Sequence, residues 1–166
     1  MTNEPTVSDV VAERVQQVRK KRGWTVKQLA ARCAELGAPE LSAQALYNLE
    51  NGRRDDSGRR RRDVTVDELL KLSYVLSVAP VHLLVPPVDG EAVVPYRFIE
   101  GVTTTPGFAR AWIRGQTPIA RVVARDYFSE VPEAEWQEPP GQWSARNVEA
   151  QSRAVEGRGQ DGKGLD

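Results

Sequence analysis

Five short stretches of helical hydrophobic spacing, separated by polar breaks, lie in residues 8–86 and constrain the fold more than any other feature. Within each stretch, apolar residues recur every three or four positions, which indicates a helix with one buried face. Helices this short do not bury their apolar faces alone, so the sequence predicts a compact all-α domain. The predicted helices cover residues 8–22, Thr25 to the break at Gly37, 43–51, 67–77 and 81–84.

Residues of the helix-capping types stand at the expected helix starts. Ser8 and Asp9 open the first stretch, and Ser42 precedes the third. Thr25 and Gln28 are spaced as a capping box, in which two side chains satisfy backbone N–H groups at one helix start. The positions expected to face the core are Val11, Val15, Val18, Leu29, Ala30, Cys33, Ala45, Leu46, Leu49, Leu69, Leu72 and Leu76.

The net charge of zero conceals an uneven distribution along the chain. Residues 1–85 carry 14 Lys and Arg against 11 Asp and Glu, whereas residues 86–166 carry 9 against 12. A basic first half followed by an acidic second half fits a DNA-contacting domain that is joined to a segment with another role.

Several classes of protein are not expected from this sequence. Cys33 is the only cysteine, which excludes an internal disulfide and a cysteine metal cluster and fits a reducing compartment. His82 is the only histidine, and Glu50 is expected to support the turn after the third helix by local hydrogen bonds, so no enzyme, metal or cofactor is predicted. The chain shows neither a secretory signal pattern nor an apolar run of membrane-helix length. We therefore expect a soluble, cytoplasmic, nucleoid-associated protein without membrane contact.

The stretch between Gly23 and Gly52 carries the functional prediction. It holds two helices joined by a turn, and the second helix has short polar side chains near its start. Gln and Asn can donate to and accept from adenine together in the major groove, which a carboxylate cannot do. On a helix that begins after Ser42, one face is opposite the core positions and is expected to read bases. That face carries Ala43, Gln44, Tyr47 and Asn48.

Four sequence blocks occur in a characteristic order: Arg19–Ala30, Leu46–Arg54, Leu69–Leu72 and Pro80–Leu84. In these blocks the chain resembles the Cro/lambda-repressor-type helix-turn-helix family, also called the XRE family, over roughly residues 11–84. The resemblance implies a five-helix, lambda-repressor-like DNA-binding domain whose third helix reads bases. For the start of that helix it implies base contacts by Ala43, Gln44 and Asn48, with Tyr47 at the edge.

The same resemblance implies phosphate contacts at the start of the second helix and in the turn after the third. Two features depart from the family pattern. Val26 stands where the family often has Gln, and the turn from Glu35 to Leu41 is longer than usual. The phosphate contacts that match this sequence are Thr25, Lys27, Asn51, Arg53 and Arg54.

Residues 53–62, here called the arginine loop, contain six arginines in ten positions. One interpretation is a flexible clamp on DNA phosphates, which could also place an arm in the minor groove. The alternative is a solvated loop that Asp55 and Asp56 neutralise in part. The clamp interpretation adds Arg59, Arg60, Arg61 and Arg62 to the phosphate-binding candidates.

The second half of the chain gives weaker patterns. Residues 88–106 predict one or two short strands or an extended arm, and residues 108–114 predict two helical turns. From about residue 129 the chain is rich in Pro, Glu, Gly and Gln, which predicts disorder with a nascent helix at 143–155. The expected organisation is a helix-turn-helix domain at 8–86, a partly structured extension at 87–128 and a disordered tail at 129–166.

Together these features predict a sequence-specific transcriptional regulator, a repressor, whose partner is double-stranded DNA. A homodimer on paired half-sites stays open, because no coiled-coil pattern is present. One alternative is a phage-type immunity repressor or an antitoxin whose C-terminal half binds a partner protein. Another is a protein-interaction adaptor that no longer reads DNA, which Val26 favours and the amide side chains disfavour.

Overall fold

The computed structural model describes residues 5–52, 54–56, 58, 60–87, 95–99 and 101–132. The chain divides into two compact units, Met1–Pro86 and Pro87–Asp166. Across the described residues the protein is mostly helical, with seven helices and one two-stranded sheet. None of these helices is long and apolar enough to cross a lipid bilayer.

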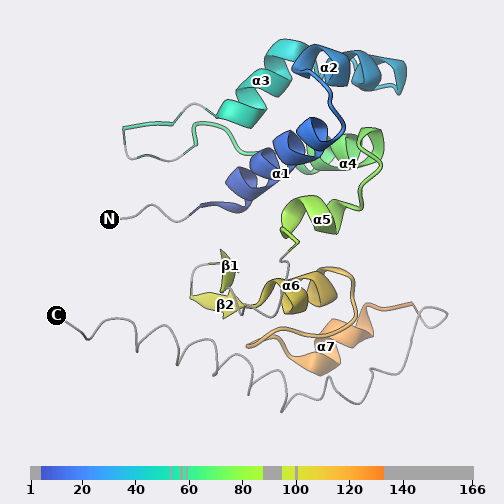
Figure 1. Ribbon diagram of the computed structural model, residues 1–166. Helices are drawn as coiled ribbons and strands as arrows, with labels where there is room; N and C mark the ends of the chain where they lie inside the picture. Colours follow the sequence, from blue (N-terminus) through green and yellow to red (C-terminus); the bar gives the residue numbers. More distant parts are fainter. Residues whose placement is uncertain are drawn as a thin grey trace. The chain divides into compact units, whose positions relative to one another are not determined.

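Five helices form the first unit and follow the predicted order (Figure 1). The predicted caps Thr25 and Ser42 accept hydrogen bonds from the backbone N–H groups of Gln28 and Ala45, so the starts of the second and third helices are confirmed. The helices are α1 (Val7–Lys21), α2 (Val26–Glu35), α3 (Ala43–Asn51), α4 (Val66–Val75) and α5 (Pro80–Leu84).

The starts of α1 and α4 differ from the prediction. Thr6, and neither Ser8 nor Asp9, is the N-cap of α1. Its hydroxyl accepts from the Asp9 N–H, while the Asp9 carboxylate accepts from the Thr6 N–H. Thr65 and Glu68 form the same reciprocal capping box at α4. Each helix begins one residue earlier than predicted because this spacing satisfies two otherwise unpaired N–H donors.

The inward stripes of the helices build the core of the first unit. Leu29, Leu46 and Leu72 are fully buried, and Val15 joins them from α1. Cys33 is equally buried, and burial, with the nearby charge of Glu40, raises the pKa of its thiol to about 11. A thiol with such a pKa stays protonated and acts as a packed apolar side chain. Among the predicted core positions, Val18, Ala30, Ala45 and Leu69 are only half-buried.

The long connection between α2 and α3, residues 36–42, contributes to packing. Ala38 and Leu41 insert into the core and are almost fully buried. The Ala38 N–H donates to the Cys33 carbonyl and the Leu41 N–H donates to the Ala38 carbonyl, which fixes the path of the connection. The extra length noted in the sequence therefore forms an ordered part of the domain that sets where α3 begins.

In the second unit, β1 (Tyr96–Ile99) pairs antiparallel with β2 (Val102–Thr104), and α6 (Pro106–Ile113) and α7 (Ala124–Ser129) follow. The strands expected within 88–106 and the helix expected at 108–114 are thus present, whereas the sequence pattern does not predict α7. The Phe98 ring stacks on Trp112 with centroids 4.8 Å apart. The Tyr127 hydroxyl donates to the Trp112 carbonyl at 2.7 Å, so strand and helices pack on one another. Residues 133–166, which hold the nascent helix and most of the disordered tail predicted at 129–166, lie outside the described part of the chain, and the first residue of that tail, Ser129, ends α7.

The C-terminal ends of α1 and α4 share one backbone motif with different residues in its left-handed position. Gly23 occupies this position after α1 with φ +70°, and Ser77 occupies it after α4 with φ +44°. In both cases the next residue donates its N–H back to a carbonyl in the last turn. A side chain in the left-handed region is strained, because its Cβ crowds the neighbouring carbonyl.

We expect Ser77→Gly to raise the free energy of unfolding by about 0.5–1 kcal/mol, because the relieved strain exceeds the added unfolded-state entropy. Gly23→Ser is the reciprocal control and is expected to lower stability, since a Cβ there meets no atom within 4 Å and adds only backbone strain. Urea denaturation of both variants measures the effect. Changes of the same sign in the two variants would contradict the explanation.

Candidate nucleic-acid interface

The two faces of α3 are clearly separated. Leu46 and Leu49 are buried in the core, whereas Gln44, Tyr47 and Asn48 are exposed, with Tyr47 57% accessible. Ala43, at the start of the helix, is half-buried. The side chains expected to read bases therefore lie on the outward face, with Ala43 at its margin.

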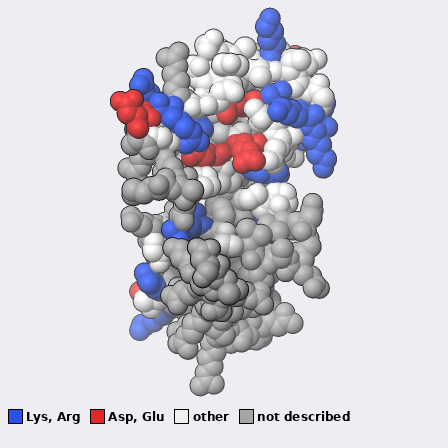
Figure 2. Space-filling model, turned by 60° about the vertical axis from the view of Figure 1, so that its left-hand side comes forward, with Lys and Arg blue, Asp and Glu red and all other residues white. Residues whose placement is uncertain are grey.

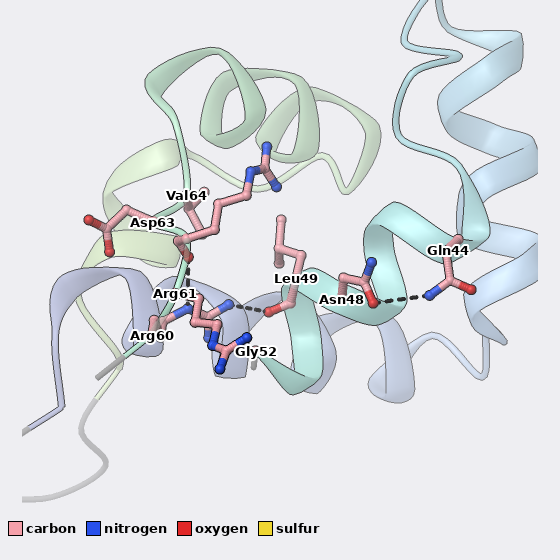
Figure 3. A pocket seen from close by; sticks show the side chains of 9 residues that line it. Gln44, Asn48, Leu49, Gly52, Arg60, Arg61, Asp63 and Val64 are labelled. Carbon is pink, nitrogen blue, oxygen red and sulfur yellow. Dashed lines mark hydrogen bonds between the residues drawn. The ribbon is translucent and has the colours of Figure 1, made fainter. Parts of the chain in front are cut away.

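Gln44 and Asn48 form a connected pair on this face. They are one helical turn apart, and the Gln44 Nε2 donates to the Asn48 Oδ1 at 3.0 Å (Figure 3). The bond fixes both amide groups relative to each other and leaves the Gln44 Oε1 as an acceptor and the Asn48 Nδ2 as a donor. The pair can thus offer a prearranged acceptor and donor to an outside partner.

A groove of about 350 Å³ separates α3 from the arginine loop (Figure 3). The helix side of the groove is formed by Gln44, Asn48, Leu49 and Gly52. The opposite side is formed by residues 60–64, which include three arginines of the loop. Predicted base-reading amides and predicted phosphate-binding arginines are therefore brought together around one hollow.

The Arg60 side chain connects the arginine loop to α3 and α1. Its side chain is only 6% exposed, and its guanidinium donates to the Leu49 carbonyl at the end of α3 and pairs with Asp9 at 3.5 Å. Gly52 makes room for it, since a Cβ at that position would lie 2.6 Å from the Arg60 Nη1. The sequence interpretation placed Arg60 among free phosphate-binding groups, whereas here its guanidinium is enclosed and hydrogen-bonded.

Two further arginines of the loop have internal partners. Arg54 pairs with Asp9 at 3.0 Å and donates to the Gly58 carbonyl at 2.8 Å. Arg62 pairs with Glu68, the residue that completes the capping box of α4. Figure 2 shows basic side chains adjoining acidic ones on the face that it presents. Arg53 and Arg59, the other two arginines of the loop, lie outside the described residues.

Asp9 anchors the arginine loop to the start of α1. Burial raises the pKa of its carboxyl, but hydrogen bonds from the Thr6 N–H and hydroxyl, with the charges of Arg54 and Arg60, outweigh burial and bring the pKa below its usual value. The carboxylate is therefore ionised at neutral pH. The preceding residue, Ser8, accepts a hydrogen bond through its hydroxyl from the backbone N–H of Val64, two residues after the loop.

The predicted phosphate contacts outside the loop differ in how free they are. Lys27 is exposed near the start of α2. The Thr25 hydroxyl is engaged in the capping box, and the Asn51 Nδ2 donates to the Tyr47 carbonyl at 2.9 Å. Val26, where the resembled family often has Gln, packs its side chain against the core. Among the described residues no cluster of His, Cys, Asp and Glu could hold a metal ion.

A buried ion pair holds α3 against α1, and the sequence interpretation missed it. The Arg19 Nε and Nη2 each donate to a carboxylate oxygen of Glu50 at 2.6 Å, and the Arg19 Nη1 donates to the Trp24 carbonyl at 2.7 Å. The Glu50 side chain is 1% exposed. Its partner comes from another helix, whereas hydrogen bonds within the local turn were expected. Arg19 follows Val15 by one turn and Glu50 follows Leu46 by one turn. A positive and a negative residue that each continue an apolar helix face could have indicated this ion pair from the sequence, because charges that become buried are paired.

We expect Arg19→Gln to lower the free energy of unfolding by about 3–5 kcal/mol, because it leaves the Glu50 carboxylate buried without its partner. Arg32→Gln is a matched control, since it breaks an exposed pair with Glu35 and should cost at most about 1 kcal/mol. Denaturant unfolding of both variants provides the comparison. Equal losses in the two variants would show that burial of the ion pair carries no special weight.

The chain matches no family model, no curated protein and no solved structure. The resemblance of residues 11–84 to the XRE family therefore stays a prediction. The functional conclusion rests instead on the exposure, contacts and charges of the residues around α3.

Proposed function

We propose that this chain is a sequence-specific double-stranded DNA-binding protein that reads the major groove with α3. In this proposal the first unit is a five-helix, lambda-repressor-like domain. The observation that carries the proposal is the exposed, hydrogen-bonded pair of Gln44 and Asn48 beside a groove lined by arginine. The role that follows is transcriptional regulation. Repression is its simplest form, because a repressor can act by stable binding to its operator alone.

The dimensions of α3 suit this role. An α-helix with its side chains is about 10–12 Å in diameter, and the major groove of B-DNA, about 12 Å wide, admits one. Helix-turn-helix proteins contact base edges with the N-terminal part of the recognition helix, where Gln44 lies, and Asn48 follows one turn later on the same face. Adenine presents one acceptor and one donor in that groove, which is the complement of a side-chain amide.

The surroundings of the amide pair also favour DNA over a protein partner. A protein interface usually has an apolar centre with aromatic anchors. Here Tyr47 is the one large apolar side chain exposed on α3, and the groove beside this helix is lined by amides and arginines. The paired half-sites and the protein partner for the second unit, which the sequence left open, stay predictions.

The proposal is tested by selecting bound duplexes from random DNA with the wild type, Gln44→Ala and Asn48→Ala. We expect the wild type to enrich a defined site, and each variant to lose about 1–3 kcal/mol of discrimination at its base while keeping weak, salt-sensitive binding.

Gln17→Ala is the matched control, because it removes an exposed amide from α1 and should leave the selected site unchanged. No enrichment by the wild type, or equal loss of preference in the control, would contradict the proposal.

A further inference from the structure

The described arginines of the loop differ sharply in how they are partnered. Arg54 and Arg60 share the Asp9 carboxylate, and Arg62 pairs with Glu68. Arg61 is exposed, and no described residue forms a hydrogen bond or ion pair with its guanidinium. Of the four described arginines of the loop, only Arg61 therefore has a guanidinium without a described partner.

The partnered arginines are poorly suited to bind phosphate. Moving Arg60 outward would uncover a side chain that is 6% exposed and remove the donor to the Leu49 carbonyl. Arg62 can turn to a phosphate only by leaving Glu68 ionised nearby, where its negative charge would repel the same phosphate. Each such contact would gain an attraction to a DNA phosphate and lose an interaction within the protein, so its net effect on the free energy of binding is small.

Arg61 has the position that a phosphate contact requires. It lines the same groove as Gln44 and Asn48, on the side opposite α3. The residue before it, Arg60, is held by Asp9 and by the Leu49 carbonyl of α3, so the backbone that carries Arg61 is fixed relative to the helix. A cation placed across a groove from base-reading side chains can meet the sugar-phosphate backbone beside the bases that are read.

We propose that Arg61 is a DNA phosphate contact next to the bases read by α3, and that Arg54 and Arg60 hold the loop that presents it. The inference rests on the proposed function, since it names a contact of the same site. It narrows the phosphate clamp expected from the sequence to one of the four described arginines.

The test is the salt dependence of binding, measured on the duplex that the wild type selects. Arg61→Gln should reduce the magnitude of the slope of log K against log salt by about 0.9, the value for one phosphate contact. The selected base sequence should not change, because a phosphate contact positions the protein and does not read bases. Arg62→Gln is the matched control: it removes the same charge from the adjacent position and should leave the slope close to that of the wild type.

The outcomes separate the two proposals. If the wild type selects a duplex but Arg61→Gln keeps its slope, or if Arg62→Gln lowers the slope equally, the assignment of Arg61 is overturned and the proposed function stands. If the wild type selects no duplex, both fall. The thermal midpoint of Arg61→Gln should equal that of the wild type, because this side chain has no described partner to lose, and a lower midpoint would also count against the assignment.

Discussion

The ion pair between Arg19 and Glu50 is the interaction on which the position of α3 depends. A nine-residue helix is not stable in water by itself, so packing against its neighbours must hold it. Leu46 and Leu49 supply apolar contact, but apolar contact alone tolerates small rotations of a helix. The two-point bond to Arg19 tolerates fewer, because any rotation that breaks it leaves a buried charge unpaired. The outward direction of Gln44 and Asn48 follows from this restriction.

A second anchor joins the arginine loop to the same framework. Asp9 completes the capping box of α1 and pairs with two arginines of the loop, so one carboxylate links the start of the domain to the segment after α3. Gly52 allows Arg60 to pass close to the chain. An arginine-rich sequence is therefore not the same as a strongly basic surface: three of the four described arginines of the loop are paired with carboxylates from other elements. The positive charge of the loop that is available to a partner is therefore smaller than the sequence suggests, and it lies at the groove beside α3.

Much of the fold could be predicted from local patterns, and most of the site's internal contacts could not. The caps Thr25 and Ser42 and the inner face of α3 follow from residues three or four positions apart, where the chain fixes the geometry. The partners of Glu50 and Asp9 come from residues far along the chain, and local spacing does not determine which distant group a charge will meet. The exposed amides on α3 were predictable because the helical period alone separates its two faces. The division of the arginines into partnered and free depends on tertiary contacts.

The central claim is that the outward face of α3 contacts base edges. The most direct measurement is an NMR titration of the ¹⁵N-labelled chain with its selected duplex, following the side-chain NH₂ resonances of Gln44 and Asn48. The account predicts that these resonances shift strongly and become protected from exchange, and that a scrambled duplex produces much weaker changes. Side-chain resonances that stay in place while residues of the second unit shift would contradict it.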